Sequence, residues 1–165
     1  MTDAPPAVPR PSASPVSSPA RTVSRIALGA ALLFTGTAHL TTARTTFQAQ
    51  VPTWMPLDAD LVVVVSGIVE LALGAALILL PRHRVVLGWT VAAFFVAIFP
   101  GNISQYVTGT AAFGLDSDTA RFARLFFQPV LVLWALWSTG AWAAWRARRR
   151  YPTGGSGSTG GGPAG

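Results

Sequence analysis

One apolar segment, DADLVVVVSGIVELALGAALILL (residues 58–80), determines the class of this protein. Residues 61–80 within it carry a single ionisable side chain, the carboxyl of Glu70. A helix of about 20 residues rises about 30 Å, which is the thickness of the hydrocarbon core of a bilayer. The segment therefore predicts a transmembrane helix over residues 61–80, with Glu70 near the middle of the membrane.

The helical periodicity of this segment indicates which way Glu70 faces. At 100° per residue, Gly67 and Gly74 lie on the same side as Glu70. The opposite side carries larger apolar residues, namely Leu61, Val65, Ile68 and Leu79. Small residues let helices approach closely in lipid, and an ionisable group at the membrane centre usually faces the bundle interior. We therefore expect Glu70 to point inward.

The composition is that of an integral membrane protein. The 165 residues are 51% hydrophobic and 11% charged, whereas soluble domains average about 25% charged residues. The chain has no cysteine, which excludes a catalytic thiol, a disulfide and an iron–sulfur cluster. The net charge of +6 comes from arginine, and in a chain of membrane spans we assign it to topology, not to nucleic-acid binding.

Three further segments predict membrane helices. The four predicted spans are 26–42, 61–80, 85–108 and 119–145. Pro100 in the third and Pro129 in the fourth predict kinks or breaks, because proline removes a backbone donor from the helix. The membrane domain is expected over residues 22–150, between a disordered tail rich in proline (1–21) and a disordered Gly/Ser tail (151–165).

The first span also has features of a cleaved signal peptide, which is the competing interpretation of this segment. Gly36, Thr37 and Ala38 form the small-x-small pattern of a signal-peptide cleavage site, although the segment in front of the apolar run is long for a leader. Gly29 and Gly36 have the same spacing as Gly67 and Gly74. This match favours a retained helix that packs on the second span through a glycine face.

The distribution of arginine predicts the orientation in the membrane. Nine arginines fall on one side of the predicted spans and three on the other, and basic residues favour the cytoplasmic side. Both termini are then cytoplasmic. The predicted fold is an all-α integral membrane four-helix bundle, N-in/C-in, in the inner (plasma) membrane and in contact with the lipid bilayer.

Six polar side chains from all four spans are predicted at a similar depth, in the outer half of the membrane. They are His39, Glu70, Asn102, Gln105, Arg124 and Gln128. A contact between His39 and Glu70 is expected, because both lie near the same level. Two interpretations of this cluster stay open: the groups fasten the helices to one another, or they form a ligand or proton site.

Several chemical classes find no support in the sequence. Haem held by two histidines is excluded because His83 falls in the predicted cytoplasmic turn. The tryptophans near the end of the fourth span are typical of an interfacial belt. The chain carries no phosphate loop and no catalytic triad. We therefore name no catalytic residue, expect no metal site, and expect no cofactor carried by the chain itself.

The chain resembles the DoxX family of small four-helix bacterial membrane proteins over roughly residues 25–145. The resemblance rests on FTGTAH (34–39), Pro52 to Pro56, SGIVELALG (66–74), Pro81 with Arg84, FPGN (99–102), and Arg124 with Gln128. It implies an accessory or scaffold subunit associated with quinone and redox chemistry. The implied ligand is a quinone, and the implied partner is a membrane or periplasmic redox protein.

A second hypothesis comes from the buried acid alone. A small proton-coupled transporter would use Glu70 to exchange protons with a substrate. In the small multidrug exporters, which are also four-helix proteins, an acid faces a homodimer partner. By analogy, a homodimer in which Glu70 faces a second copy is the alternative to an internal site. The exporters' acid lies in the first span, however, and this difference disfavours the analogy.

Overall fold

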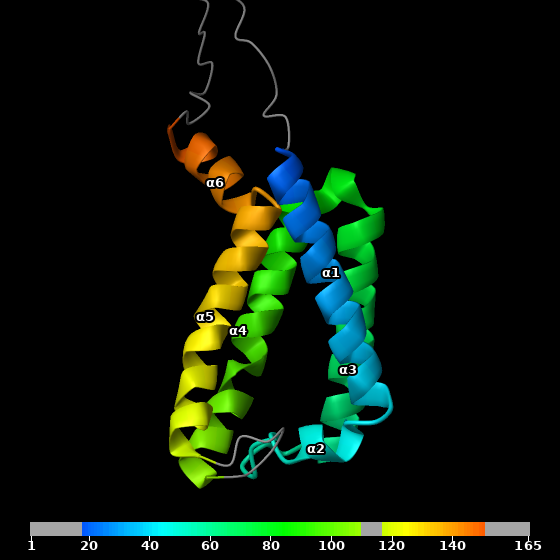
Figure 1. Cartoon of the computed structure of the whole chain (residues 1–165), viewed down its shortest axis with the longest axis vertical. Coiled ribbons are helices and arrows are strands. Elements are labelled where there is room, and N and C mark those ends of the chain that lie inside the picture. The colour runs from blue at the N-terminus through cyan, green and yellow to red at the C-terminus, as the bar shows by residue number, and fades with distance from the viewer. Residues whose placement is uncertain (1–17, 110–116, 151–165) are drawn as a thin grey trace, which may run out of the picture.

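Every element in the part of the chain that the structure describes is a helix (Figure 1). The computed structural model describes residues 18–109 and 117–150. Its helices are α1 (Pro19–Leu40), α2 (Arg44–Gln48), α3 (Ala59–Leu79), the 3₁₀ turn η1 (Pro81–His83), α4 (Arg84–Thr108), α5 (Asp118–Ser138) and α6 (Ala141–Arg150). The predicted N-terminal tail covers residues 1–21. Its residues 1–17 lie outside the described residues, but Pro19 to Arg21 belong to α1, so this part of the prediction is wrong. The predicted tail over residues 151–165 also lies outside the described residues.

Local capping chemistry sets where the first and third helices begin. The Ser18 hydroxyl accepts a hydrogen bond from the backbone N–H of Arg21, and Pro19 takes the first helical position. α1 therefore starts at Pro19, seven residues before the predicted start at residue 26. The Asp58 carboxylate accepts the Leu61 N–H at 3.0 Å and begins α3 in the same way.

Three helices are long and apolar enough to cross a membrane: α1, α3, and α4 together with η1. A fourth span results if α5 and α6 are taken as one span, although the two meet at an angle of 67°. The structure thus confirms an all-α protein with three to four candidate membrane-spanning helices.

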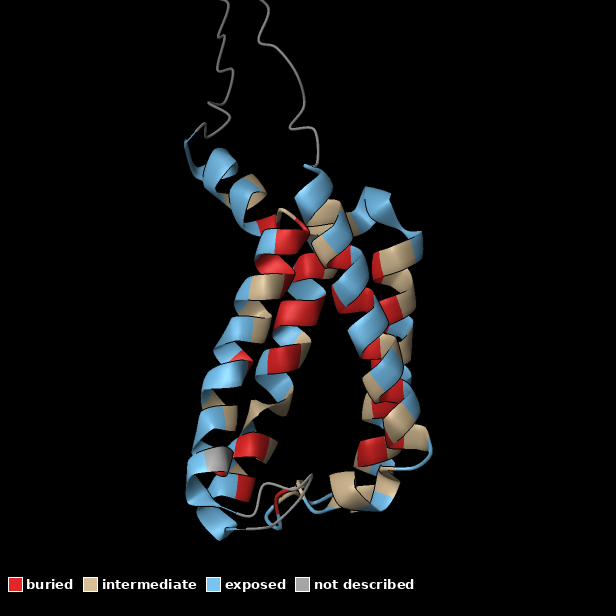
Figure 2. Ribbon diagram, viewed as in Figure 1, coloured by how far each residue is buried: buried red, intermediate tan, exposed pale blue. Residues whose placement is uncertain are grey.

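The long helices form two pairs that converge at one end (Figure 1). α1 packs along α3, and α4 packs along α5. The pairs meet near the end that carries Pro19 and Arg150, called the terminus end here. They separate toward the end that carries α2, called the loop end. The buried residues lie on the faces that the helices turn toward one another (Figure 2).

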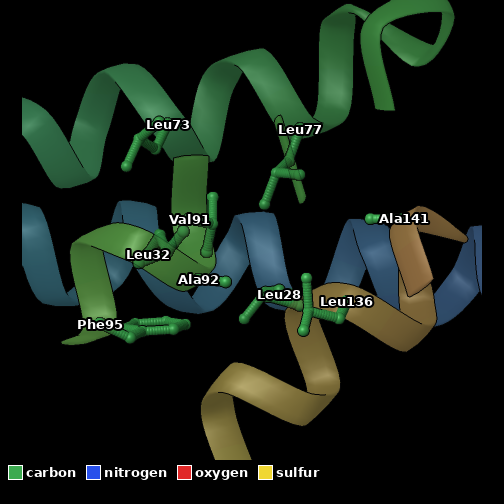
Figure 3. Packing of buried hydrophobic residues seen from close by; sticks show 10 residues of the cluster. Leu28, Leu32, Leu73, Leu77, Val91, Ala92, Phe95, Leu136 and Ala141 are labelled. Carbon is green, nitrogen blue, oxygen red and sulfur yellow. The ribbon is translucent and has the colours of Figure 1, made fainter. Parts of the chain in front are cut away.

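The apolar core joins the two pairs where they converge (Figure 3). It is built from side chains of all the long helices and the start of α6: Leu28, Leu32, Leu73, Leu77, Val91, Ala92, Phe95, Ala135, Leu136 and Ala141. Because this cluster lies toward the terminus end, it holds the pairs together there and leaves space between them toward the loop end.

The α1–α3 interface is built on glycine, as the matched spacing predicts. A Cβ on Gly74 would lie 2.7 Å from the carbonyl oxygen of Gly29, and a Cβ on Gly36 would lie 2.8 Å from that of Gly67. Backbones at this distance leave no room for any side chain. Glu70 is buried beside this interface, and Leu61, Val65, Ile68 and Leu79 on the opposite face are exposed. The structure therefore confirms that the glycine faces of α1 and α3 pack on each other and that Glu70 points inward.

A break of the third helix at Pro100 is wrong, whereas kinks at Pro100 and Pro129 stay predictions. α4 continues through Pro100 and α5 through Pro129. Pro100 leaves the carbonyl of Val96, four residues earlier, without its helical N–H donor. The side-chain amide of Gln128 donates to the neighbouring carbonyl of Phe95 and ties α5 to α4 in this turn.

The fourth predicted helix, 119–145, is divided at residues 139–140 instead. Gly140 adopts a left-handed conformation (φ 74°), and Thr139 donates its hydroxyl to the carbonyl of Ala135. Thr139 also packs directly on Gly88 of α4, where no side chain would fit. The turn is thus fixed by a contact with a helix that is distant in sequence.

Candidate functional site

A cavity of about 920 Å³ lies between the two helix pairs. Its walls are mostly apolar and aromatic, with Leu32 on α1, Val63 on α3, Phe95 on α4 and Leu131 on α5. The segment after α1 contributes a further side, which includes Phe47, Val51, Pro52, Trp54 and Met55. This volume lies within the range of sites for small organic ligands, which is about 300–1,000 Å³.

The cavity reaches the surface of the bundle in the middle of its helices. Ala31 of α1, Ala97 of α4 and Phe127 of α5 all line the cavity and are themselves exposed. Each lies near the centre of a helix of 21 to 25 residues. In a membrane-spanning bundle such positions face lipid, so an apolar ligand has a route into the cavity from the bilayer.

His39 and Glu70 meet at the wall of this cavity. The Nδ1 atom of His39, near the end of α1, lies 3.2 Å from the Oε2 atom of Glu70 on α3. The close packing of Gly36 against Gly67, one turn before each of them, brings the two side chains together. The expected contact between this imidazole and this carboxyl is therefore present.

The carboxyl of Glu70 has unused hydrogen-bonding capacity. Nδ1 of His39 also lies 2.9 Å from the carbonyl oxygen of Thr35. This carbonyl accepts a hydrogen bond from Nδ1 in the tautomer that carries a proton there. Oε2 of Glu70 is fully buried, and apart from its 3.2 Å ion-pair contact with Nδ1 of His39 it makes no hydrogen bond in the described part of the chain. A carboxylate oxygen can accept more than one hydrogen bond, so Glu70 offers a further acceptor to a ligand in the cavity.

The imidazole of His39 is held by an aromatic ring as well as by the acid. Its ring stacks on Phe47 of α2 with a centroid distance of 3.5 Å and an interplanar angle of 16°.

Glu70 is only 5% exposed within a single chain. The carboxyl therefore points into the protein, and this argues against a site in which it faces a second copy.

On the opposite wall, Asn102 and Gln128 form a polar pair. The amide of Asn102 on α4 donates to Oε1 of Gln128 on α5 at 2.9 Å, and the amide of Gln128 donates to the Phe95 carbonyl. Both side chains are buried and both line the cavity. This pair fastens α4 to α5, which is the structural role that the sequence left open for the cluster.

Arg124 connects α5 to the segment that covers the loop end of the cavity. Its guanidinium donates to Oε1 of Gln50 at 3.3 Å, and both residues line the cavity. The same segment is tied to α3, because Arg44 and Gln48 of α2 donate to the Asp60 carboxylate, with Arg44 Nε at 2.6 Å. The Asp60 carboxylate also raises the pKa of the Arg44 guanidinium.

Five of the six predicted site residues line one cavity: His39, Glu70, Asn102, Arg124 and Gln128. Gln105 does not line it, although its side chain is buried in the bundle. Sequence reasoning missed Phe47 and Gln50, which sit in a segment with no membrane periodicity. Within residues 18–109 and 117–150, no group of three metal-ligating side chains comes together. The role of the five residues as a ligand or proton site stays a prediction.

A comparison with protein families places most of the membrane domain in a known group. The family model described as a domain of unknown function (DUF8561) matches residues 28–139, which span the cavity walls from α1 to the end of α5. No curated protein and no solved structure matches the chain. The resemblance to DoxX proteins is thus a prediction that the matching family neither names nor describes.

Proposed function

The chain belongs to the DUF8561 family, and we propose that it is an accessory subunit of a membrane redox system that holds a quinone in the cavity between its helix pairs. The observation that carries this proposal is the His39–Glu70 pair, 3.2 Å apart at the wall of a mostly apolar cavity. The DoxX resemblance of the sequence points to the same ligand class.

The lining of the cavity matches the chemistry of a quinone headgroup. A quinone accepts hydrogen bonds in its oxidised form, donates them in its reduced form, and exchanges two electrons and two protons. The cavity offers donors in Asn102 and Arg124 and a buried acceptor in Oε2 of Glu70. Phe95 and Leu131 supply apolar surface for the ring and tail. Entry from the bilayer past Ala31 and Phe127 suits a ligand that is dissolved in lipid.

The residues of the chain supply positioning, not electrons. The Glu70 carboxyl accepts a hydrogen bond from the reduced headgroup beside the imidazole of His39, and both side chains line the cavity. The chain contains no cysteine, so iron–sulfur or thiol chemistry would come from a membrane or periplasmic partner. We propose an accessory subunit because the chain would position the quinone while a partner protein supplied the electrons.

A proton-coupled transporter is the second candidate. Glu70 and Arg124 line the same cavity, so a substrate could compete with protons for the carboxyl, as in small exporters. This candidate predicts net transport by the protein alone, whereas the accessory subunit predicts a bound quinone and no transport.

Glu70→Gln is the variant that separates the two. The protein is purified in mild detergent, its quinone content is measured by extraction and chromatography, and ubiquinone and menaquinone analogues are titrated. Loss of one charge-assisted hydrogen bond, about 1.5–3 kcal/mol, weakens quinone binding roughly tenfold or more in Glu70→Gln. Asp58→Asn is the matched control, because it removes an acid from the same helix and keeps a good N-cap.

Each result decides between the candidates. Quinone retained by wild type and Asp58→Asn but lost by Glu70→Gln supports the proposal. Uptake driven by a proton gradient in liposomes, with no quinone bound, favours the transporter. Equal quinone affinity in all three proteins, with only a lower melting temperature for Glu70→Gln, means that the polar cluster is helix fastening.

A further inference from the structure

The charges of this protein are separated along the bundle axis. The described arginines at the terminus end lie at the start of α1, in and after η1, and in α6: Arg21, Arg25, Arg82, Arg84, Arg146, Arg148, Arg149 and Arg150 (Figure 1). The described carboxylates lie at the starts of α3 and α5 and in the middle of α3. Within residues 18–109 and 117–150, the terminus end therefore has no acid to balance its arginines.

Arg25 is the exception among these arginines, because it is buried. It is 6% exposed, and its Nη1 atom is fully buried without a hydrogen-bond partner in the described part of the chain. The nearby Arg84 guanidinium repels it. A buried guanidinium costs free energy unless an anion accepts its hydrogen bonds. The side chain of Arg25 is thus positioned for an anionic group that the described part of the chain does not supply there.

A groove lies one helical turn from Arg25. Arg21, four residues earlier on the same face of α1, lines a groove of about 400 Å³ together with Leu133, Leu136, Trp137 and Trp142. The groove is created by the sharp turn at Gly140, where α6 leaves the axis of α5 by 67°. Its walls combine one guanidinium with apolar and aromatic surface, which is the arrangement found where proteins meet lipid headgroups.

We propose that the terminus end binds the phosphate of an anionic phospholipid, with Arg25 and Arg21 as its ligands and the groove at Gly140 receiving the glycerol and upper acyl chains. Guanidinium binds phosphate oxygens through paired hydrogen bonds. The arginine distribution predicts that this end faces the cytoplasm, where the membrane leaflet carries anionic lipids. The site is separate from the His39–Glu70 cavity and does not depend on the proposed redox function.

The test measures lipid selectivity by native mass spectrometry and by thermal unfolding of the full chain in neutral detergent. Phosphatidylglycerol and phosphatidylcholine with the same acyl chains are added in turn. Wild type is expected to bind phosphatidylglycerol roughly tenfold or more tightly than phosphatidylcholine, a difference of about 1.4 kcal/mol per factor of ten. Arg25→Gln removes this preference. Arg148→Gln is the matched control, because it removes the same charge from an exposed position at the same end.

Thermal unfolding without lipid distinguishes a binding role from a structural one. Because Nη1 of Arg25 has no hydrogen-bond partner among the described residues, Arg25→Gln is expected to unfold at or above the wild-type temperature in detergent alone. Phosphatidylglycerol is not expected to raise the unfolding temperature of this variant. A lower unfolding temperature for Arg25→Gln in detergent, with lipid preference retained, overturns the proposal. So does equal loss of preference in Arg148→Gln, which indicates attraction by net charge without a site.

Two further arms identify the source of the anion. Inorganic phosphate alone, at millimolar concentration, is expected to leave the unfolding temperature unchanged. Stabilisation by phosphate equal to that by phosphatidylglycerol overturns the lipid assignment. Asp3, which lies outside the described residues, is the remaining acid of the N-terminal region. If Asp3→Asn creates the lipid preference and wild type has none, the chain supplies its own anion and the proposal fails.

Discussion

Replacing Gly36 with alanine tests how the α1–α3 interface holds the His39–Glu70 pair. A Cβ at this position would lie 2.8 Å from the carbonyl oxygen of Gly67 and 3.0 Å from the Cβ of Glu70. Ordinary contacts begin at 3.4 Å, so α1 must retreat from α3 by about 0.6 Å (3.4 minus 2.8). The atom in the way is a backbone carbonyl of α3, which cannot move aside by changing rotamer as a side chain can.

The expected cost follows from this displacement. Overpacking of a close interface costs about 1–3 kcal/mol, and the gain in helix propensity from glycine to alanine returns about 0.5–1 kcal/mol. A net loss of about 1–2 kcal/mol lowers the melting temperature of a chain of this size by about 2–8 °C. The same retreat lengthens the 3.2 Å distance between His39 and Glu70, so the proposed quinone binding is expected to weaken as well.

Thermal unfolding in detergent, followed by circular dichroism, measures the effect. Gly101→Ala is the matched control, because a Cβ there meets only the carbonyl oxygen of Gln50, in a segment outside the long helices, at 3.1 Å. The control requires a shift of only about 0.3 Å (3.4 minus 3.1), against one contact, and is expected to lower the melting temperature less than Gly36→Ala. If Gly36→Ala melts at the same temperature as Gly101→Ala, α1 and α3 do not pack as closely as described, and the explanation for the position of Glu70 fails.

Two other predictions concern orientation and the second polar pair. Reporter fusions after Arg82 and within residues 110–116 are expected to report opposite compartments, and the N-in/C-in topology is wrong if both report the same one. Gln128→Leu leaves the amide of Asn102 and the carbonyl of Phe95 without a side-chain partner. It should lower the free energy of unfolding by about 1–3 kcal/mol, and an unchanged unfolding curve contradicts a fastening role.

Local sequence properties were enough to predict the membrane class and the face on which Glu70 lies. Periodicity assigns Leu61 and Ile68 to one side of a helix, and both are exposed. Equal spacing of glycines in two spans predicts that they pack on each other, and the contact of Gly29 with Gly74 confirms it. These predictions succeed because helical geometry fixes which residues share a face before any tertiary contact forms.

The sequence could not show which distant groups meet. Gln128 of α5 donates to the carbonyl of Phe95 in α4, and Thr139 packed on Gly88 fixes the turn that replaces a single fourth span.

The same limit applies to the candidate sites. Phe47 stacks on His39, and Gln105 is buried but does not line the cavity. Nη1 of Arg25 is buried without a hydrogen-bond partner in the described part of the chain. Apolar periodicity within one helix contains no information on these contacts, because each depends on how two elements far apart in the chain are placed. The membrane class and the direction of Glu70 follow from the sequence alone, whereas the cavity, the burial of Arg25 and the helix break are set by tertiary packing.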